Sequence, residues 1–280
     1  MINKAVIAVA GFGTRLLPAT KAQPKEMMAL ADKPIIHYIA EEAAQSGIKD
    51  IVFVLSENKK SIKDYFSRNN KLEQRLKNKP QLLKQIIEPV NMANFFYTYQ
   101  KKMAGCGDAI LCAEHLIKNE SFAVMFGDDV IDNSVPCLRQ MIEVYKKYKT
   151  AVVAVRRVPR SEVNKYGVIK GRKIKDRVYK IESLVEKPSI KEAPSNLAIV
   201  GRYIFPPDIF KYLRKIKVKN GKESGVSDAL LEMIKEMPVY AYEFKGTRLD
   251  CGNKLGYLKA NVYFGEKHKE IGKEFKRWLR

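Results

Sequence analysis

Short runs of consecutive apolar residues alternate along the first half of the chain with stretches whose apolar residues recur at helical spacing. Such runs predict strands buried on both faces, and the helical spacing predicts amphipathic helices between them. The predicted strands are residues 4–10, 51–55, 85–88, 122–126 and 151–155. The predicted helices are residues 34–46, a charged stretch from about 58, 109–117 and 141–148. This alternation is typical of an α/β fold with a mainly parallel sheet and helices on both faces.

Shorter β-like segments follow after about residue 158. Predicted strands at 167–170, 178–185 and 197–205 are separated by polar turns, and we expect them to extend the same sheet. Predicted helices cover 206–213, 227–237 and the chain from about 254. No internal repeat or Gly/Ser linker interrupts the pattern. We therefore expect residues 1–280 to form a single domain.

The formal net charge of +21 would suit nucleic acid, an anionic membrane or phosphorylated substrates. The excess comes mostly from lysines scattered among acidic residues in helix-like stretches such as 58–79 and 253–280, without interleaved aromatic residues. This distribution favours solvated helix faces over a polyanion site. We therefore expect no nucleic-acid partner.

The cysteines and histidines give no sign of a metal site. The four cysteines form no C-x-x-C pair and the three histidines lie far apart, so a structural zinc site is not expected. The apolar run at residues 5–10 is too short for a signal peptide, and no later segment approaches the length of a membrane span. We expect a cytoplasmic protein with no membrane partner and with reduced cysteines.

A glycine-rich loop, residues 11–15, follows the first predicted strand and reads G-F-G-T-R. Glycines let backbone amides approach phosphate oxygens, and Arg15 and Lys25 would add positive charge beside a triphosphate. The loop is not a Walker motif, and Leu16 stands where G-x-G-x-x-G requires its third glycine. Asp128 stands at the C-terminal end of a predicted strand, where open parallel sheets place their ligands.

The longer pattern G-x-G-T-R-x-x-P-x-T, with K-E-M beyond it, resembles the sugar nucleotidylyltransferase superfamily. Within that superfamily, residues 12–43 look like the UTP:glucose-1-phosphate uridylyltransferase branch. The similarity continues in residues 88–100, 197–210 and 240–265. It implies a Rossmann-like, mixed sheet of the nucleotide-diphospho-sugar transferase fold. The implied parts are a nucleotide-binding half at about 1–130, a sugar-binding half at about 131–252 and C-terminal helices at about 253–280.

The resemblance also implies roles for the residues at matching positions. The nucleotide-binding positions are Ala10, Gly11, Gly13, Thr14, Arg15, Lys25, Gln100 and Gly105, with Gly107 beside them. Gln100 would read the uracil edge. The sugar-phosphate positions are Gly167, Glu186 and Lys187, and the catalytic positions are Arg15, Lys25, Asp128 and Lys187. Asp128 and Asp250 would bind Mg²⁺, for which carboxylate oxygens are suitable ligands.

The implied reaction joins UTP and glucose 1-phosphate to give UDP-glucose and pyrophosphate. The sugar phosphate would attack the α-phosphorus of UTP in line, with Mg²⁺ present and without a covalent enzyme intermediate. The family resemblance further implies a homo-oligomer, either a dimer or a tetramer.

Two segments depart from the family pattern. In the base loop, Asp108 replaces the usual histidine, which indicates either a different helix cap or an altered nucleotide preference. Residues 221–227 do not align with the usual glutamate and glutamine, which leaves galactose 1-phosphate or an aminosugar phosphate open.

Three alternatives to the uridylyl transfer remain. The nearest is transfer from dTTP by a glucose-1-phosphate thymidylyltransferase, since Gln100 can read either pyrimidine. A non-catalytic regulatory relative and a nucleic-acid binder are the others. The sequence keeps the charged residues at the implied catalytic and metal-binding positions, which argues against a catalytically inactive relative. These residues are Arg15, Lys25, Asp128, Lys187 and Asp250.

Overall fold

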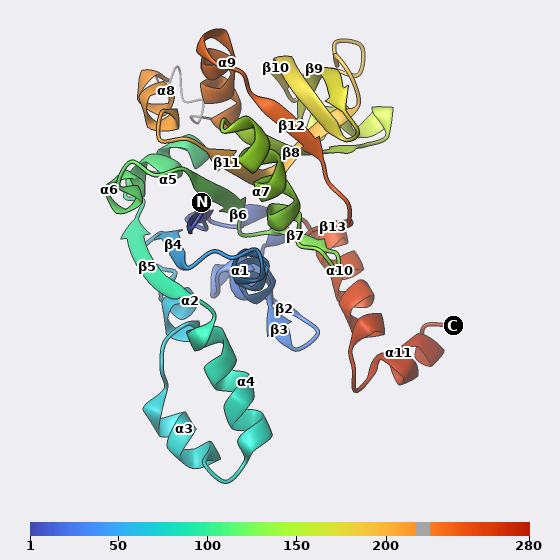
Figure 1. The fold of residues 1–280 in the computed structure, drawn as a ribbon. Helices are drawn as coiled ribbons and strands as arrows, with labels where there is room; N and C mark the ends of the chain where they lie inside the picture. Colours follow the sequence, from blue (N-terminus) through green and yellow to red (C-terminus); the bar gives the residue numbers. More distant parts are fainter. Residues whose placement is uncertain (217–224) are drawn as a thin grey trace.

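A nine-stranded mixed sheet forms the centre of the computed structural model, which describes residues 1–216 and 225–280 (Figure 1). The strands are β1 Lys4–Ala8, β4 Asp50–Leu55, β5 Asn94–Tyr99, β6 Phe122–Phe126, β8 Val152–Arg157, β9 Gly167–Lys175, β10 Val178–Glu186, β11 Leu197–Phe205 and β12 Tyr240–Glu243. Their order is β5-β4-β1-β6-β11-β8-β12-β10-β9. The strands β5, β4, β1 and β6 pair in parallel, as do β8 and β12. Both β10 and β11 run antiparallel to their neighbours.

Helices cover both faces of this sheet. The α-helices are α1 Ile35–Gln45, α2 Lys60–Tyr65, α3 Asn70–Leu76, α4 Pro80–Asn91, α5 Cys106–Cys112, α6 Glu114–Ile117, α7 Cys137–Tyr148, α8 Ile209–Lys215, α9 Val226–Glu236, α10 Lys254–Lys267 and α11 Gly272–Trp278. Short 3₁₀ helices are η1 Thr14–Leu16, η2 Ala19–Lys21, η3 Lys25–Met27 and η4 Arg160–Lys165. Two small antiparallel sheets pair β7 Asp129–Asp132 with β13 Thr247–Asp250, and β2 Ala29–Leu30 with β3 Lys33–Pro34. The predicted α/β class is confirmed.

Alternation along the parallel strands builds one hydrophobic core on each face. In β1, Ala5 and Ile7 belong to the core beneath α1 and α7, whereas Val6 belongs to the core beneath α5, α8 and α9. Because both faces are covered, these strands read as unbroken apolar runs. That is why β1, β4, β6 and β8 were recognisable from sequence.

One predicted strand is wrong, because residues 85–88 lie within the helix α4. Pro80 occupies the first turn of that helix, and Leu83 and Ile87 are spaced four residues apart on one side of it. A segment of four residues with two adjacent isoleucines fits both the helical period of about 3.6 residues and the strand period of about 2 residues. The strand of this region is β5 instead, and α3 and α4 project from the body as an arm (Figure 1).

Arg202 lies at the centre of the fold, fully buried within β11. Its Nη2 donates to Glu42 Oε2 at 2.7 Å and to the Asp129 carbonyl oxygen at 2.7 Å. Glu42 Oε1 also accepts the Leu138 amide at 3.1 Å, which links α1 to the start of α7. Burial opposes the charge of Arg202, but the charge and hydrogen bonds of Glu42 together with the charge of Asp129 raise the pKa of Arg202. The pair fixes three elements behind the turn that carries Asp128.

The single domain and its nucleotide-binding and sugar-binding halves stay predictions. Within the described residues, no helix is long and apolar enough to cross a membrane. Most of the departure at residues 221–227 lies outside the described residues, which resume at Gly225.

Candidate active site

The glycine-rich loop leaves the carboxyl end of β1 and turns at Gly13. Gly13 has φ 68° and is the N-cap of η1, a conformation that glycine adopts without strain. Its carbonyl accepts a hydrogen bond from Thr20 Oγ1 at 2.9 Å, which closes the loop. Ala10 is buried at its base, whereas Gly11 and Thr14 are exposed and leave the outer face of the loop open.

Lys25 and Asp128 meet beside this loop. Lys25 Nζ lies 2.5 Å from Asp128 Oδ2, with the two side chains 16% and 17% exposed. Arg15 Nη2 lies 3.9 Å from the same oxygen but is 65% exposed, so it can move toward a ligand. Burial acts against both charges, yet Asp128 raises the pKa of Lys25 and Lys25 lowers the pKa of Asp128. Both groups are therefore charged near neutral pH.

Asp250 completes this group through a glycine that the sequence did not single out. A Cβ placed on Gly252 would lie 2.5 Å from Asp128 Oδ2, 2.8 Å from Arg15 Nη2 and 3.1 Å from Asp250 Oδ1. The two carboxylates and the guanidinium thus converge on a spot that only glycine leaves open. The Gly252 amide also donates to Asp250 Oδ1 at 2.9 Å, which orients that carboxylate.

The two aspartates come together because β7 pairs with β13. Asp129 lies opposite Asp250 in that antiparallel pair, and the Cys251 amide donates to the Asp128 carbonyl at 2.8 Å. Gly127 allows the turn before β7 to sit close, since a Cβ there would lie 2.3 Å from Val9. Among the described residues, no group of three or more His, Cys, Asp or Glu side chains could hold a metal unaided.

A buried ion pair lies directly beneath Lys25. Lys59 Nζ donates to Glu26 Oε2 at 2.7 Å, and both side chains are 3% exposed or less. Burial raises the pKa of Glu26 and lowers the pKa of Lys59, because it disfavours both charges. The attraction between the two charges has to offset the free-energy cost of removing them from water. Glu26 also contributes to the raised pKa of Lys25. The sequence analysis did not predict this ion pair, since only the K-E-M segment that contains Glu26 matched the family pattern.

A second group lies where β5 ends. Gln100 is 5% exposed, and its Nε2 donates to the Gly105 carbonyl at 3.0 Å and to Asp108 Oδ2 at 2.8 Å. Gly105 has φ 104° and is the N-cap of α5, with Gly107 buried in the first turn. The predicted base-binding residues are therefore together, and Gly105, not Asp108, occupies the cap position.

A third group lies on β9 and β10. Glu186 Oε2 accepts from Ser227 Oγ at 2.7 Å, and a Cβ on Gly167 would lie 2.9 Å from the same oxygen. Lys187 Nζ lies 3.8 Å from Glu186 Oε1. The Lys187 amide donates to the Tyr166 carbonyl at 3.0 Å. Lys187 is thus placed with the sugar-binding positions and pairs with Glu186 rather than with Asp128.

Arg248 connects the second aspartate of the turn to the third group. Its Nε donates to Asp129 Oδ1 at 2.6 Å, its Nη1 donates to Tyr166 Oη at 3.2 Å, and its guanidinium lies 5.0 Å from the Tyr166 ring centre. Burial acts against its charge, but Asp129 raises the pKa of Arg248. Sequence reasoning missed this pair, because Asp129 and Arg248 are far apart in the chain.

A cavity of about 520 Å³ opens beside these groups. Its wall includes Arg15, Tyr166, Arg248 and Asp250, so it reaches one of the two carboxylates and the residue that precedes Gly167. Its basic lining is completed by Arg156, Lys165 and Lys259. A predominantly cationic wall that includes Asp250 suits a phosphorylated ligand.

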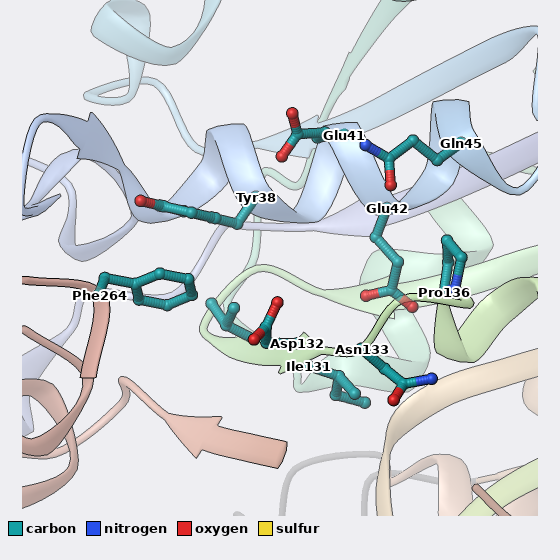
Figure 2. A pocket seen from close by; sticks show the side chains of 10 residues that line it. Tyr38, Glu41, Glu42, Gln45, Ile131, Asp132, Asn133, Pro136 and Phe264 are labelled. Atoms are coloured by element: carbon teal, nitrogen blue, oxygen red, sulfur yellow. The ribbon is translucent and has the colours of Figure 1, made fainter. Parts of the chain in front are cut away.

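A smaller cavity, of about 60 Å³, lies apart between α1 and β7 (Figure 2). Its lining is acidic, but its carboxylates are already paired within the fold. Glu42 bonds Arg202, and Asp132 accepts from Tyr263 Oη at 2.7 Å and pairs with Lys267. This cavity belongs to the framework and not to the site.

Comparison with known proteins identifies the family. Residues 4–267 match the model of the family described as nucleotidyl transferase. A UTP–glucose-1-phosphate uridylyltransferase of Bacillus subtilis is 45% identical, and the match covers 99% of this chain and 94% of that protein. A relative from Staphylococcus haemolyticus with the same enzyme name is 43% identical over 100% of this chain and 98% of its own length.

Solved structures agree with this match. A crystal structure of UDP-glucose pyrophosphorylase complexed with UDP-glucose is 42% identical with a TM-score of 0.88, covering 96% of this chain and 100% of that chain. A UTP-bound UGPase from Acinetobacter baumannii is 37% identical with a TM-score of 0.93, covering 100% and 99%. The resemblance and the predicted fold are thereby confirmed, and the chain belongs to the nucleotidyl transferase family, in the branch of the UTP–glucose-1-phosphate uridylyltransferases.

Proposed function

We propose that the chain transfers the uridylyl group of UTP to glucose 1-phosphate, forming UDP-glucose and pyrophosphate. The observation that carries this proposal is the convergence of Arg15, Asp128 and Asp250 on Gly252, with Lys25 in contact with Asp128. It occurs in a chain whose full-length relatives are named for this reaction. The neighbouring groups around Gln100 and Glu186 are suited to the base and the sugar.

Charge neutralisation and alignment account for the chemistry. An oxygen of the sugar phosphate forms a bond to the α-phosphorus of UTP as the bond from that phosphorus to pyrophosphate breaks. Lys25 stays protonated, so it supplies positive charge for the α-phosphate and not a base. The attacking phosphate is already ionised, and no side chain has to remove a proton from it. The exposed guanidinium of Arg15 is free to contact the departing pyrophosphate.

The carboxylates fit a divalent cation, which nucleotidyl transferases of this family typically use. We assign Mg²⁺ to Asp128 and Asp250, because their oxygens face one shared opening at Gly252 and are the hard donors that Mg²⁺ prefers. Among the described residues no third carboxylate, histidine or cysteine completes a metal site there, so phosphate oxygens and water would supply the other ligands. Bound Mg²⁺ would offset the negative charge of the triphosphate.

Specificity is assigned to the two flanking groups. Gln100, with Gly105 and Gly107 beneath the base, would bind uracil. Glu186 would accept hydrogen bonds from glucose hydroxyls, and Lys187 would bind the sugar phosphate. Ser227 holds Glu186 in place. A homo-oligomer, a dimer or a tetramer, and a cytoplasmic location remain part of the proposal, and light scattering tests the oligomer.

A pyrophosphate-release assay tests the proposal. Purified protein is given Mg²⁺ and glucose 1-phosphate with UTP or dTTP in parallel, and Asp128→Asn serves as the inactive control. Release with UTP that disappears in the control supports uridylyl transfer. Faster release with dTTP would assign the chain to thymidylyl transfer, and no release with either nucleotide would refute the proposed reaction.

A further inference from the structure

Gln100 offers a ligand only part of its hydrogen-bonding capacity. A side-chain amide nitrogen carries two hydrogens. In Gln100 one is donated to the Gly105 carbonyl at 3.0 Å and the other to Asp108 Oδ2 at 2.8 Å. The residue is 5% exposed, and its backbone amide donates to the Leu55 carbonyl at 2.8 Å. The donors are therefore consumed inside the protein, and only Oε1 remains for a base.

The two acceptors also determine which way the amide faces. A carbonyl oxygen and a carboxylate accept hydrogen bonds and do not donate. Turning the amide over would bring Oε1 against both oxygens, which would replace two hydrogen bonds by two repulsive contacts. Asp108 contributes the stronger of these, because a carboxylate forms charge-assisted hydrogen bonds. A histidine nitrogen, by contrast, can donate or accept.

We infer that Asp108 is a specificity-determining positioning residue, which holds the Gln100 amide so that the site presents an acceptor to the nucleobase. The inference rests on the proposed function, in which Gln100 reads the base. Uracil and thymine carry an imide N3–H, which matches an acceptor. Cytosine carries an unprotonated N3, itself an acceptor, and is rejected. Asp108 thus separates UTP and dTTP from CTP but does not separate UTP from dTTP.

The magnitude follows from the mismatch. An unpaired or repulsive polar contact in a buried site costs about 1–3 kcal/mol, which corresponds to about 5- to 150-fold in binding. We therefore expect the protein to bind UTP more tightly than CTP by a factor in this range. The triphosphate and ribose are shared by the two nucleotides, so their ratio isolates the contribution of the base.

Equilibrium binding of UTP, dTTP and CTP by calorimetry, with Mg²⁺ and without sugar phosphate, tests the inference. Asp108→Ala frees one Gln100 hydrogen for a ligand, and the UTP-to-CTP ratio should fall by about tenfold. Asp108→Asn removes the charge and keeps an acceptor oxygen, but its amide can also turn over and donate, so the ratio should fall less than in Asp108→Ala. The UTP-to-dTTP ratio should stay constant in both variants. Glu143→Gln, at an exposed position of α7, controls for the loss of a carboxylate elsewhere.

The outcomes separate the inference from the reaction on which it rests. If wild type prefers UTP over CTP and Asp108→Ala leaves the ratio within about twofold, Asp108 does not position Gln100, whereas the proposed reaction stands. A larger loss in Asp108→Asn than in Asp108→Ala would also overturn the inference, because the loss of charge and not of the acceptor would then be the cause. If no nucleotide binds, the proposed base site fails and the inference fails with it. Melting curves check folding, and Asp108→Leu replaces the alanine variant if that variant does not fold.

Discussion

Gly252→Ala is the most direct test of the geometry around the two carboxylates. The added methyl group would lie 2.5 Å from Asp128 Oδ2, 2.8 Å from Arg15 Nη2 and 3.1 Å from Asp250 Oδ1. An ordinary contact is about 3.4 Å, so Asp128 Oδ2 would have to move by about 0.9 Å, the difference between 3.4 and 2.5 Å. Arg15 can rotate away, since it is 65% exposed, but Asp128 is held by Lys25.

This displacement should act on catalysis far more than on folding. Misplacing a catalytic group by about 1 Å can cost about 10²-fold in rate, so we expect kcat/KM for pyrophosphate release to fall by about that factor. The backbone at Gly252 lies outside the left-handed region, and its amide is retained in alanine. We therefore expect the melting temperature to change little.

Gly47→Ala supplies the opposite control. Gly47 has φ 93° at the end of α1, with nothing within 4 Å of its would-be Cβ. Alanine should there cost about 1 kcal/mol of stability through backbone strain, while leaving the activity of the folded protein unchanged. If Gly252→Ala keeps full kcat/KM, the convergence of the carboxylates is not needed for the reaction, and the reasoning is wrong.

Three further predictions follow from the same contacts. Glu26→Gln leaves the Lys59 charge buried without its partner. The free energy of unfolding, measured by urea denaturation, should therefore fall by about 3–5 kcal/mol. A loss below about 1 kcal/mol would contradict this expectation. Ser227→Ala releases Glu186, so KM for glucose 1-phosphate should rise severalfold while KM for UTP stays constant, and equal changes in both would argue against a sugar-specific role. The Lys25–Asp128 pair should show no titration between about pH 5 and 9. Because the pKa of Asp128 is lowered, the stability that its charge contributes is present above the ordinary aspartate pKa and is lost only on acidification. Because the pKa of Lys25 is raised, the stability that its charge contributes is present below the ordinary lysine pKa and is lost only at strongly alkaline pH. A protonation step between about pH 5 and 9 in the folded, ligand-free protein, followed by NMR and absent from Asp128→Asn, would refute this assignment.

The pattern of apolar and polar residues was enough to predict the strands that are buried on both faces. Strands covered on both faces read as apolar runs, and the glycine-rich loop and Asp128 follow such runs directly. Residues 85–88 failed because so short a segment fits two periods, and the arm formed by α3 and α4 lacks the packing that would distinguish them.

The contacts that shape the site were beyond sequence reasoning for a different reason. Gly252 looks like any turn glycine until Asp128, Asp250 and Arg15 are seen around it. The partners Glu26 and Lys59 are 33 residues apart, and Glu42 and Arg202 are 160 apart. Nothing local in a charged residue reveals which distant charge it meets, so the predicted residues were placed in three groups only by the fold.

The pairing of β7 with β13 has a consequence for the order in which the protein becomes active. Asp128 and Asp250 are brought together by strands whose residues, such as Val130 and Leu249, are separated by most of the second half of the chain. During synthesis the nucleotide loop, Lys25 and Asp128 emerge long before β13 does, and contacts between distant segments form late. A nascent chain can thus present the phosphate loop while it still lacks Asp250 and Gly252. Catalytic competence would arise only when the segment that carries Asp250 and Gly252 has left the ribosome and β13 has paired with β7.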